Sequence, residues 1–142
     1  MTNPSTVGAV AERELACALL RVGWSVFAPL FDAHGRIDLV IMDPSGTVLR
    51  TQVKTSRLVR DGTVLCFRTC SNTANRPVGY GEEIDVFGVW SPDLEQAFVV
   101  PIAVTPTRLC HLRLAPPANG QRSGIRYAVD FAVTRRGFSN RG

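Results

Sequence analysis

A single helical pattern followed by a long run of strand patterns constrains the fold of this chain most. Residues 6–22 repeat apolar side chains at helical spacing, with Ser5 or Thr6 able to cap the start and Gly23 able to end the helix. The rest of the chain consists of short apolar or alternating segments separated by turns. This order predicts an α+β fold, or an α/β fold with a mixed sheet.

The strand-like segments end at turn residues such as Gly, Pro, Asn and Asp. We expect strands at 24–28, 37–42, 48–55, 63–69, 84–90, 96–101 and 110–112. Short turns at 43–46 and 91–93 predict two antiparallel hairpins. The stretches 71–81 and 116–124 are expected to be loops, and 125–131 a last apolar segment.

Length and composition predict one globular domain. The chain has 142 residues, 45% apolar and 20% charged, which is enough for a core and argues against disorder. We expect the domain to span 1–133 and to be followed by a basic, mobile tail at 134–142. No apolar run approaches the roughly 20 residues that span a bilayer, and the N-terminus lacks signal-peptide character. These features predict a cytoplasmic protein with no membrane partner.

Lysine is nearly absent from the chain. Lys54 is the only lysine, and the other fifteen of the 16 basic residues are arginines. An ammonium group is compact and can lose its proton, whereas a guanidinium stays protonated and needs a wide planar site. Lys54 is therefore a candidate for chemistry, although chance alone could also leave one lysine there.

Polar side chains gather on the first predicted hairpin. A two-residue period places Asp38 opposite the apolar face formed by Ile37, Leu39 and Ile41. The same period places Arg50, Gln52 and Lys54 on one face of the next strand. A polar set on a strand face among apolar residues is costly without a function.

Glu12 adds a carboxylate to the apolar stripe of the helix, beside Leu15 and Leu19. A buried acid needs a partner, a hydrogen bond or a metal. A glutamate at the edge of the stripe could equally reach water.

Together these residues can form an oxygen site for Mg²⁺, which prefers hard oxygen ligands. Asp38 would supply a charged ligand, and the side-chain carbonyl of Gln52 and the backbone carbonyl of Val53 would supply neutral ones. Glu12 could bind through water or hold a second ion. Lys54 could orient or deprotonate the attacking water, or steady charge on a phosphate. These groups together are suited to hydrolysing a phosphodiester bond.

The order helix Glu12, strand Asp38, turn, strand Gln52-x-Lys54 resembles the PD-(D/E)xK nuclease superfamily, and more narrowly its branch of group I intron-associated homing endonucleases. The stretches that carry the resemblance are 8–12, 23–29, 37–40, 46–54, 80–87 and 98–101. The resemblance implies an α/β (α+β), restriction-endonuclease-like core of αβββαβ type, with a central mixed β-sheet flanked by helices. It also implies Mg²⁺-dependent cleavage of double-stranded DNA, with Mn²⁺ able to substitute, and assembly as a homodimer or homotetramer.

The resemblance assigns catalytic roles to Glu12, Asp38, Gln52 and Lys54, with Asp38 as main metal ligand. Two positions depart from the motif: Ile37 replaces proline, and Gln52 replaces an acid. A neutral ligand attracts metal less, so a catalytically inactive DNA-binding module on the nuclease fold is the alternative. Glutamine at this position is, however, known in the intron-associated branch. A scaffold that uses the fold only for packing is a third hypothesis.

The chain has a net charge of +4, which suits a polyanionic partner without requiring one. Candidate DNA contacts are Arg50, Arg57, Arg60, Arg76 and Tyr80. Arginines beside the active strand would position phosphates without reading sequence. Asp85 is expected to hold the fold through hydrogen bonds.

Overall fold

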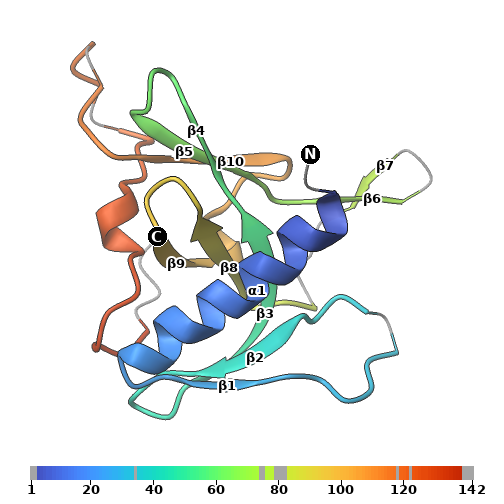
Figure 1. Ribbon diagram of the computed structural model, residues 1–142. Coiled ribbons are helices and arrows are strands. Elements are labelled where there is room, and N and C mark those ends of the chain that lie inside the picture. The colour runs from blue at the N-terminus through green and yellow to red at the C-terminus, as the bar shows by residue number, and fades with distance from the viewer. Residues whose placement is uncertain are drawn as a thin grey trace.

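The computed structural model describes residues 3–33, 35–73, 76–78, 83–117, 119–121 and 123–138. It begins with one long helix, α1 (Pro4–Arg21), and continues mainly as strands (Figure 1). The strands are β1 (Ser25–Phe27), β2 (Leu39–Met42), β3 (Val48–Thr55), β4 (Arg57–Val59), β5 (Val64–Arg68), β6 (Ser71–Thr73), β7 (Arg76–Val78), β8 (Val86–Ser91), β9 (Gln96–Pro101) and β10 (Leu109–Arg113). Two 3₁₀ turns are η1 (Ile102–Val104) and η2 (Ala128–Asp130).

The central sheet is mixed, as the sequence predicted. Its strand order is β1-β2-β3-β8-β9, and every neighbouring pair is antiparallel except β3 and β8. Both predicted hairpins, β2–β3 and β8–β9, are confirmed. The parallel β3–β8 pair places the two halves of the chain side by side in the middle of the sheet.

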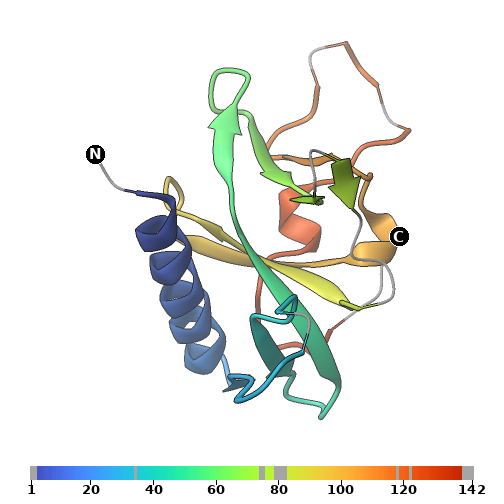
Figure 2. The same ribbon diagram turned by 90° about the vertical axis from the view of Figure 1, so that its right-hand side faces the viewer.

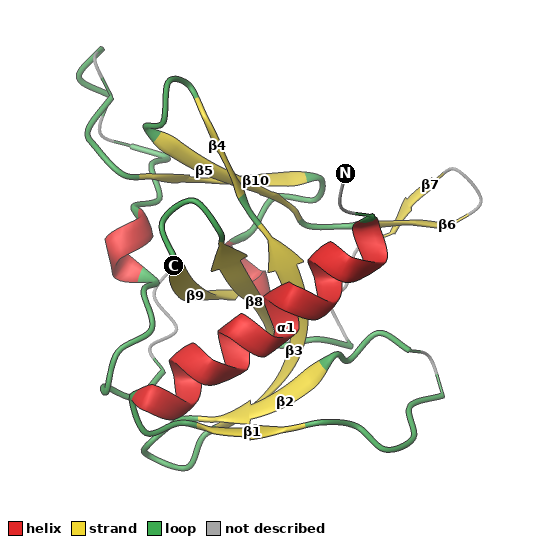
Figure 3. Ribbon diagram, in the orientation of Figure 1, coloured by secondary structure: helices red, strands yellow, loops and turns green. Residues whose placement is uncertain are grey.

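Helix α1 lies across one face of this sheet (Figure 3). Its buried residues, Ala11, Leu15 and Leu19, follow the expected helical spacing and pack against a cluster that includes Leu39, Ile41, Leu49, Val86, Trp90, Ala97 and Val99. The helix comes close to the sheet at Gly88, where a Cβ atom would stand 2.5 Å from Cδ2 of Leu15. The helix therefore packs tightly enough to fix the position of the side chains it carries.

A second layer covers the other face of the central sheet. It is a three-stranded antiparallel sheet in the order β10-β5-β4. Its inward side chains, among them Leu65, Phe67 and Leu112, pack on Phe87, Val89, Phe98 and Val100 of the central sheet. Figure 2 shows β3 leading upward into β4, so that this second layer stands directly beyond the end of β3.

Several expectations were wrong in detail. The helix cap is Asn3, whose side chain accepts a hydrogen bond from the Thr6 backbone, and not Ser5 or Thr6. The stretch 71–81 holds a small antiparallel pair, β6–β7, among its described residues, because strand pairing can form locally even in a Gly- and Pro-rich segment. Strand β4 went unrecognised because three residues carry too little periodicity.

The second helix of the αβββαβ pattern has no counterpart in the described ranges, where α1 is the one α-helix. Strands β4 to β7 lie between β3 and β8 instead. Across the same ranges, no helix is both long and apolar enough to cross a bilayer.

Candidate active site

The candidate site lies where β2 and β3 separate. The last residues of β2 and β3 that pair in register are Leu39 and Thr51. Next to this pair, the Asp38 backbone N–H donates a hydrogen bond of 2.9 Å to the Thr51 carbonyl. Strand β3 continues alone on this side, and Asp38 Oδ2 accepts a hydrogen bond of 2.8 Å from the Val53 N–H. A carboxylate thus takes the place of the next strand partner and is held against the edge of β3.

Two carboxyl groups share this region. Burial raises the pKa of Asp38, and the hydrogen bond from Val53 and the positive charge of Lys54 only partly oppose that rise. Burial and the negative charge of Asp38 both raise the pKa of Glu12, on helix α1. The charges of Asp38 on Glu12 and of Lys54 on Asp38 therefore act across one region, although the three residues come from α1, from the position before β2 and from β3. This geometry agrees better with a Glu12 side chain that turns toward the sheet than with the alternative in which it reaches water.

Gln52 brings an unsatisfied oxygen to the same strand. Its Oε1 atom is buried and accepts no hydrogen bond from any described residue. A buried carbonyl without a donor is costly, and such atoms are rare in folded proteins. The N–H and C=O of one strand residue point to the same side, so the Val53 carbonyl faces the edge of β3 where Asp38 lies. Gln52 and Val53 therefore bring two neutral oxygens to the stretch of β3 against which the Asp38 carboxylate is held.

Lys54 is half-buried, and its Nζ atom lies 5.9 Å from the centre of the Phe87 ring. A cation within about 6 Å of an aromatic face is attracted to it. Phe87 belongs to β8 and pairs in register with Gln52. The parallel partner strand therefore supports the lysine, a role that the spacing of the sequence did not reveal.

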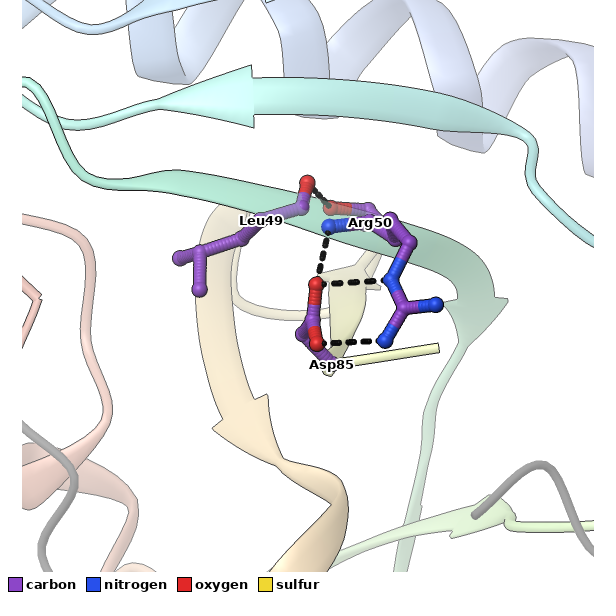
Figure 4. Close-up of polar contacts among 4 residues, drawn as sticks. Leu49, Arg50 and Asp85 are labelled. Carbon is purple, nitrogen blue, oxygen red and sulfur yellow. Dashed lines mark hydrogen bonds and ion pairs between the residues drawn. The ribbon is translucent and has the colours of Figure 1, made fainter. Parts of the chain in front are cut away.

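Arg50 of β3 forms a pair with Asp85, the residue just before β8 (Figure 4). The Asp85 carboxylate accepts from the Arg50 backbone N–H at 2.7 Å, from Nε at 3.1 Å and from Nη2 at 2.9 Å. The hydrogen bonds from Arg50 lower the pKa of Asp85 despite its partial burial. The prediction that Asp85 holds the fold through hydrogen bonds is confirmed, and Arg50 shares in that role.

The other candidate DNA contacts lie away from this centre. Arg57 is exposed at the start of β4, and Arg60 is exposed in the β4–β5 turn. Arg76 begins β7, and its side chain lies outside the described part. Tyr80 also lies outside the described residues. Asp38 is therefore linked to Glu12, Val53 and Lys54. Gln52 is carried by the same strand as Val53 and Lys54, and Arg57 begins the next strand, β4.

The described residues contain no group of three or more His, Cys, Asp and Glu side chains that could hold a metal ion. The set assembled here differs from such a group because it combines carboxylates with an amide and a peptide carbonyl. All of its donor atoms are oxygens, which suits Mg²⁺ better than zinc or copper. The unpartnered Gln52 oxygen is the observation that fits a cation best, since a bound ion would satisfy it.

The comparisons with known proteins identify the fold as that of a nuclease. The sequence profile of the PD-(D/E)XK endonucleases matches residues 2–134, and the chain belongs to this family. Among solved structures, the bacterial homing endonuclease I-Ssp6803I is similar, with a TM-score of 0.64 and 25% sequence identity over 93% of this chain and 88% of the other. No curated protein matches the sequence. The resemblance to the PD-(D/E)xK nucleases and their homing endonuclease branch is thereby confirmed.

Proposed function

We propose that the protein is a Mg²⁺-dependent DNA endonuclease of the homing type, with Asp38, Gln52, Val53 and Glu12 around the ion and Lys54 as the catalytic lysine. The single observation that carries the proposal is the buried Gln52 Oε1 atom without a donor, on the strand that also carries Lys54. Membership of the family supports nuclease activity, and the likeness to a homing endonuclease supports the proposed homing role.

The chemistry follows from the residues themselves. A bound Mg²⁺ would supply charge stabilisation at the phosphate and a more acidic water. Asp38 is fixed in orientation by its hydrogen bond from Val53, so its free oxygen can be presented in one direction. Lys54, held over Phe87, can donate a hydrogen bond to the phosphate or take up a proton from the attacking water. Cutting both strands of a duplex requires two such sites, which favours a symmetric pair of subunits.

The test uses supercoiled plasmid carrying a library of inserts, with Mg²⁺ or Mn²⁺. Wild-type protein should nick or linearise DNA, and Lys54→Ala and Asp38→Ala should lose at least a hundredfold in rate while keeping wild-type circular dichroism. Lys54→Arg is the matched control for charge. It should stay inactive, because a guanidinium cannot give up its proton.

Metal linkage gives a readout that does not depend on finding the target sequence. Mg²⁺ should raise the melting temperature of the wild type, because a ligand that binds only the folded state stabilises it. Gln52→Met keeps the size of the side chain and removes the orphaned oxygen. The variant should be at least as stable without Mg²⁺ and should lose most of the Mg²⁺-induced rise. Gln52→Glu should keep the Mg²⁺-induced rise in melting temperature.

The inactive DNA-binding alternative predicts a different set of results. The protein would then bind duplex in a salt-dependent way, cut nothing with either metal, and melt at the same temperature with and without Mg²⁺. A wild-type cutting rate in Asp38→Ala would refute the assigned site, whichever metal is used.

A further inference from the structure

A hollow of about 540 Å³ lies on the second layer, away from the candidate active site. Its charged or titratable lining residues are Arg60, His111, Arg113 and Arg126. Its neutral donors include Thr63, Asn119 and Gln121, and among the described residues no Asp or Glu side chain lines it. A hollow with three guanidinium groups and several neutral donors is suited to an anion.

These groups come from three separate segments of the chain. Arg60 lies in the β4–β5 turn, in the left-handed conformation with φ of 52°. Arg113 ends β10, and its Nε donates to the Ala115 carbonyl at 2.8 Å. Arg126 donates from Nε to the Val104 carbonyl at 2.6 Å. Because each of the two Nε atoms is tied to a backbone carbonyl, both guanidinium planes are held in fixed orientations before any ligand arrives.

The positive charges act on a common space. His111 lies in β10, in register with Cys66 of β5, which is in register with Arg57 of β4. Residues in register lie on the same face of a sheet, so Arg57 and His111 share the outer face. Burial lowers the pKa of His111, and the charges of Arg60 and Arg57 lower it further. The acid nearest in sequence to these arginines, Asp61, is exposed and does not line the hollow.

The position of the hollow relative to the active site is set by the continuity of β3 and β4. Arg60 lies six positions after Lys54, and at about 3.3 Å for each extended residue the span is at most roughly 20 Å. B-form DNA places successive phosphates of one strand about 3.4 Å apart along its axis, so roughly 20 Å corresponds to about six base pairs. A duplex cut near Lys54 and running along β3 and β4 would therefore pass close to the hollow.

We propose that this arginine-lined hollow, formed by the β4–β5 turn, the end of β10 and the segment around Arg126, binds a DNA backbone phosphate up to about six base pairs from the cleaved bond. The inference rests on the proposed function only in taking DNA as the substrate. Such a contact would anchor the duplex in the right register over the active site and would not read its sequence. It extends the predicted role of Arg60 to two arginines and a histidine that lie far from it in the sequence.

The test measures binding of a 30-base-pair duplex by fluorescence anisotropy at several salt concentrations, in the Lys54→Ala background so that no cutting occurs. Arg60→Gln should weaken binding about tenfold at low salt and reduce the slope of log K against log [salt] by about 0.9, as expected for one lost phosphate contact. Arg113→Gln, combined with Arg60→Gln, should lower the slope again. Arg60 is exposed in a turn, so its substitution should not perturb folding.

Arg21→Gln is the matched control, because Arg21 is also exposed but lies at the far end of α1. It should leave affinity and slope unchanged. Equal losses in Arg21→Gln and Arg60→Gln would overturn the proposal, because the effect would then be one of net charge alone. An unchanged affinity and slope in Arg60→Gln would overturn it too.

A second arm separates DNA from small phosphates as the source of the anion. Inorganic phosphate and AMP are titrated into wild type and Arg60→Gln by calorimetry. Tight binding of either one that depends on Arg60, together with unchanged DNA binding, would overturn the proposal. Failure of the proposed function is distinguishable: wild-type protein would then bind DNA through Arg60 and yet never cut it with Mg²⁺.

Discussion

Substituting Gly88 by alanine tests whether the close contact between α1 and the central sheet positions the site. Gly88 lies in β8, in register with Val53. A Cβ atom there would stand 2.5 Å from Cδ2 of Leu15 and 3.0 Å from Cγ2 of Thr51. Carbon atoms in favourable contact are about 3.5–4.0 Å apart, so the Leu15 side chain or the whole helix must withdraw by about 1 Å.

The expected loss of stability follows from two opposing effects. Overpacking a buried site typically destabilises by about 1–3 kcal/mol. Replacing glycine by alanine restricts the unfolded chain and returns about 0.4–1 kcal/mol. The net loss should be about 1–2 kcal/mol, which for a domain of this size lowers the melting temperature by about 3–8 °C.

The same change should reach the active site. Glu12 precedes Leu15 by about one helical turn on α1, so withdrawal of the helix moves Glu12 away from Asp38. We expect a reduced cutting rate in Gly88→Ala even at temperatures where the protein is fully folded. Urea denaturation and a plasmid cutting assay measure the two effects on the same preparation.

A double-mutant cycle isolates the contact. Leu15→Ala alone should destabilise by about 2–5 kcal/mol, and the Leu15→Ala, Gly88→Ala double variant should lose at least about 1 kcal/mol less than the sum, because the new methyl group occupies vacated space. Gly8→Ala is the control, since a Cβ there meets nothing within 4 Å. This account of the packing would be refuted if Gly88→Ala were as stable as the wild type, or if the losses of stability in the two single variants added up to the loss in the double variant.

Two predictions concern pH. Burial raises the pKa of Asp38 in the folded state. The contribution of Asp38 to stability is therefore fully present below its unfolded pKa and is lost as pH rises through its folded pKa. In melting curves taken without metal, Asp38→Asn should match the wild type near pH 3 and should be more stable than the wild type at pH 7. Burial alone would raise the pKa of Asp43, but hydrogen bonds from Ser45, Phe138 and Thr47 outweigh it and hold the pKa low. Its contribution is present above the unfolded pKa and lost as pH falls through the folded one, so Asp43→Ala should be less stable at pH 7 and lose less on acidification; equal acid sensitivity of variant and wild type would contradict this.

The hydrogen bond from the Phe138 N–H to Asp43 also bears on the C-terminal segment. Thr134 accepts a second bond, from Trp24 Nε1 at 2.8 Å. The described start of the expected tail is therefore tied to the β2–β3 turn and to the residue just before β1. The expected mobility of the remaining residues stays a prediction.

Local periodicity in the sequence was enough to determine the elements that carry the motif. The β2–β3 hairpin, the strand face shared by Gln52 and Lys54, and the inward stripe of α1 all depend on neighbours within a few residues, and β3 was predicted with its bounds. Ile37 was wrongly grouped with Leu39, because it packs against the other core cluster. The regular alternation ends at Asp38, whose side chain binds β3.

Only the tertiary structure decided which distant groups meet. The parallel pairing of β3 with β8 sets Phe87 under Lys54 and Asp85 against Arg50, and it depends on contacts between residues more than thirty positions apart. The approach of Glu12 to Asp38 is set by how closely α1 packs at Gly88, and the arginine-lined hollow is assembled from three segments with no common spacing. Periodicity fixes the direction of a side chain within its own strand or helix, whereas the distance between two elements is fixed by the packing of the cores that lie between them.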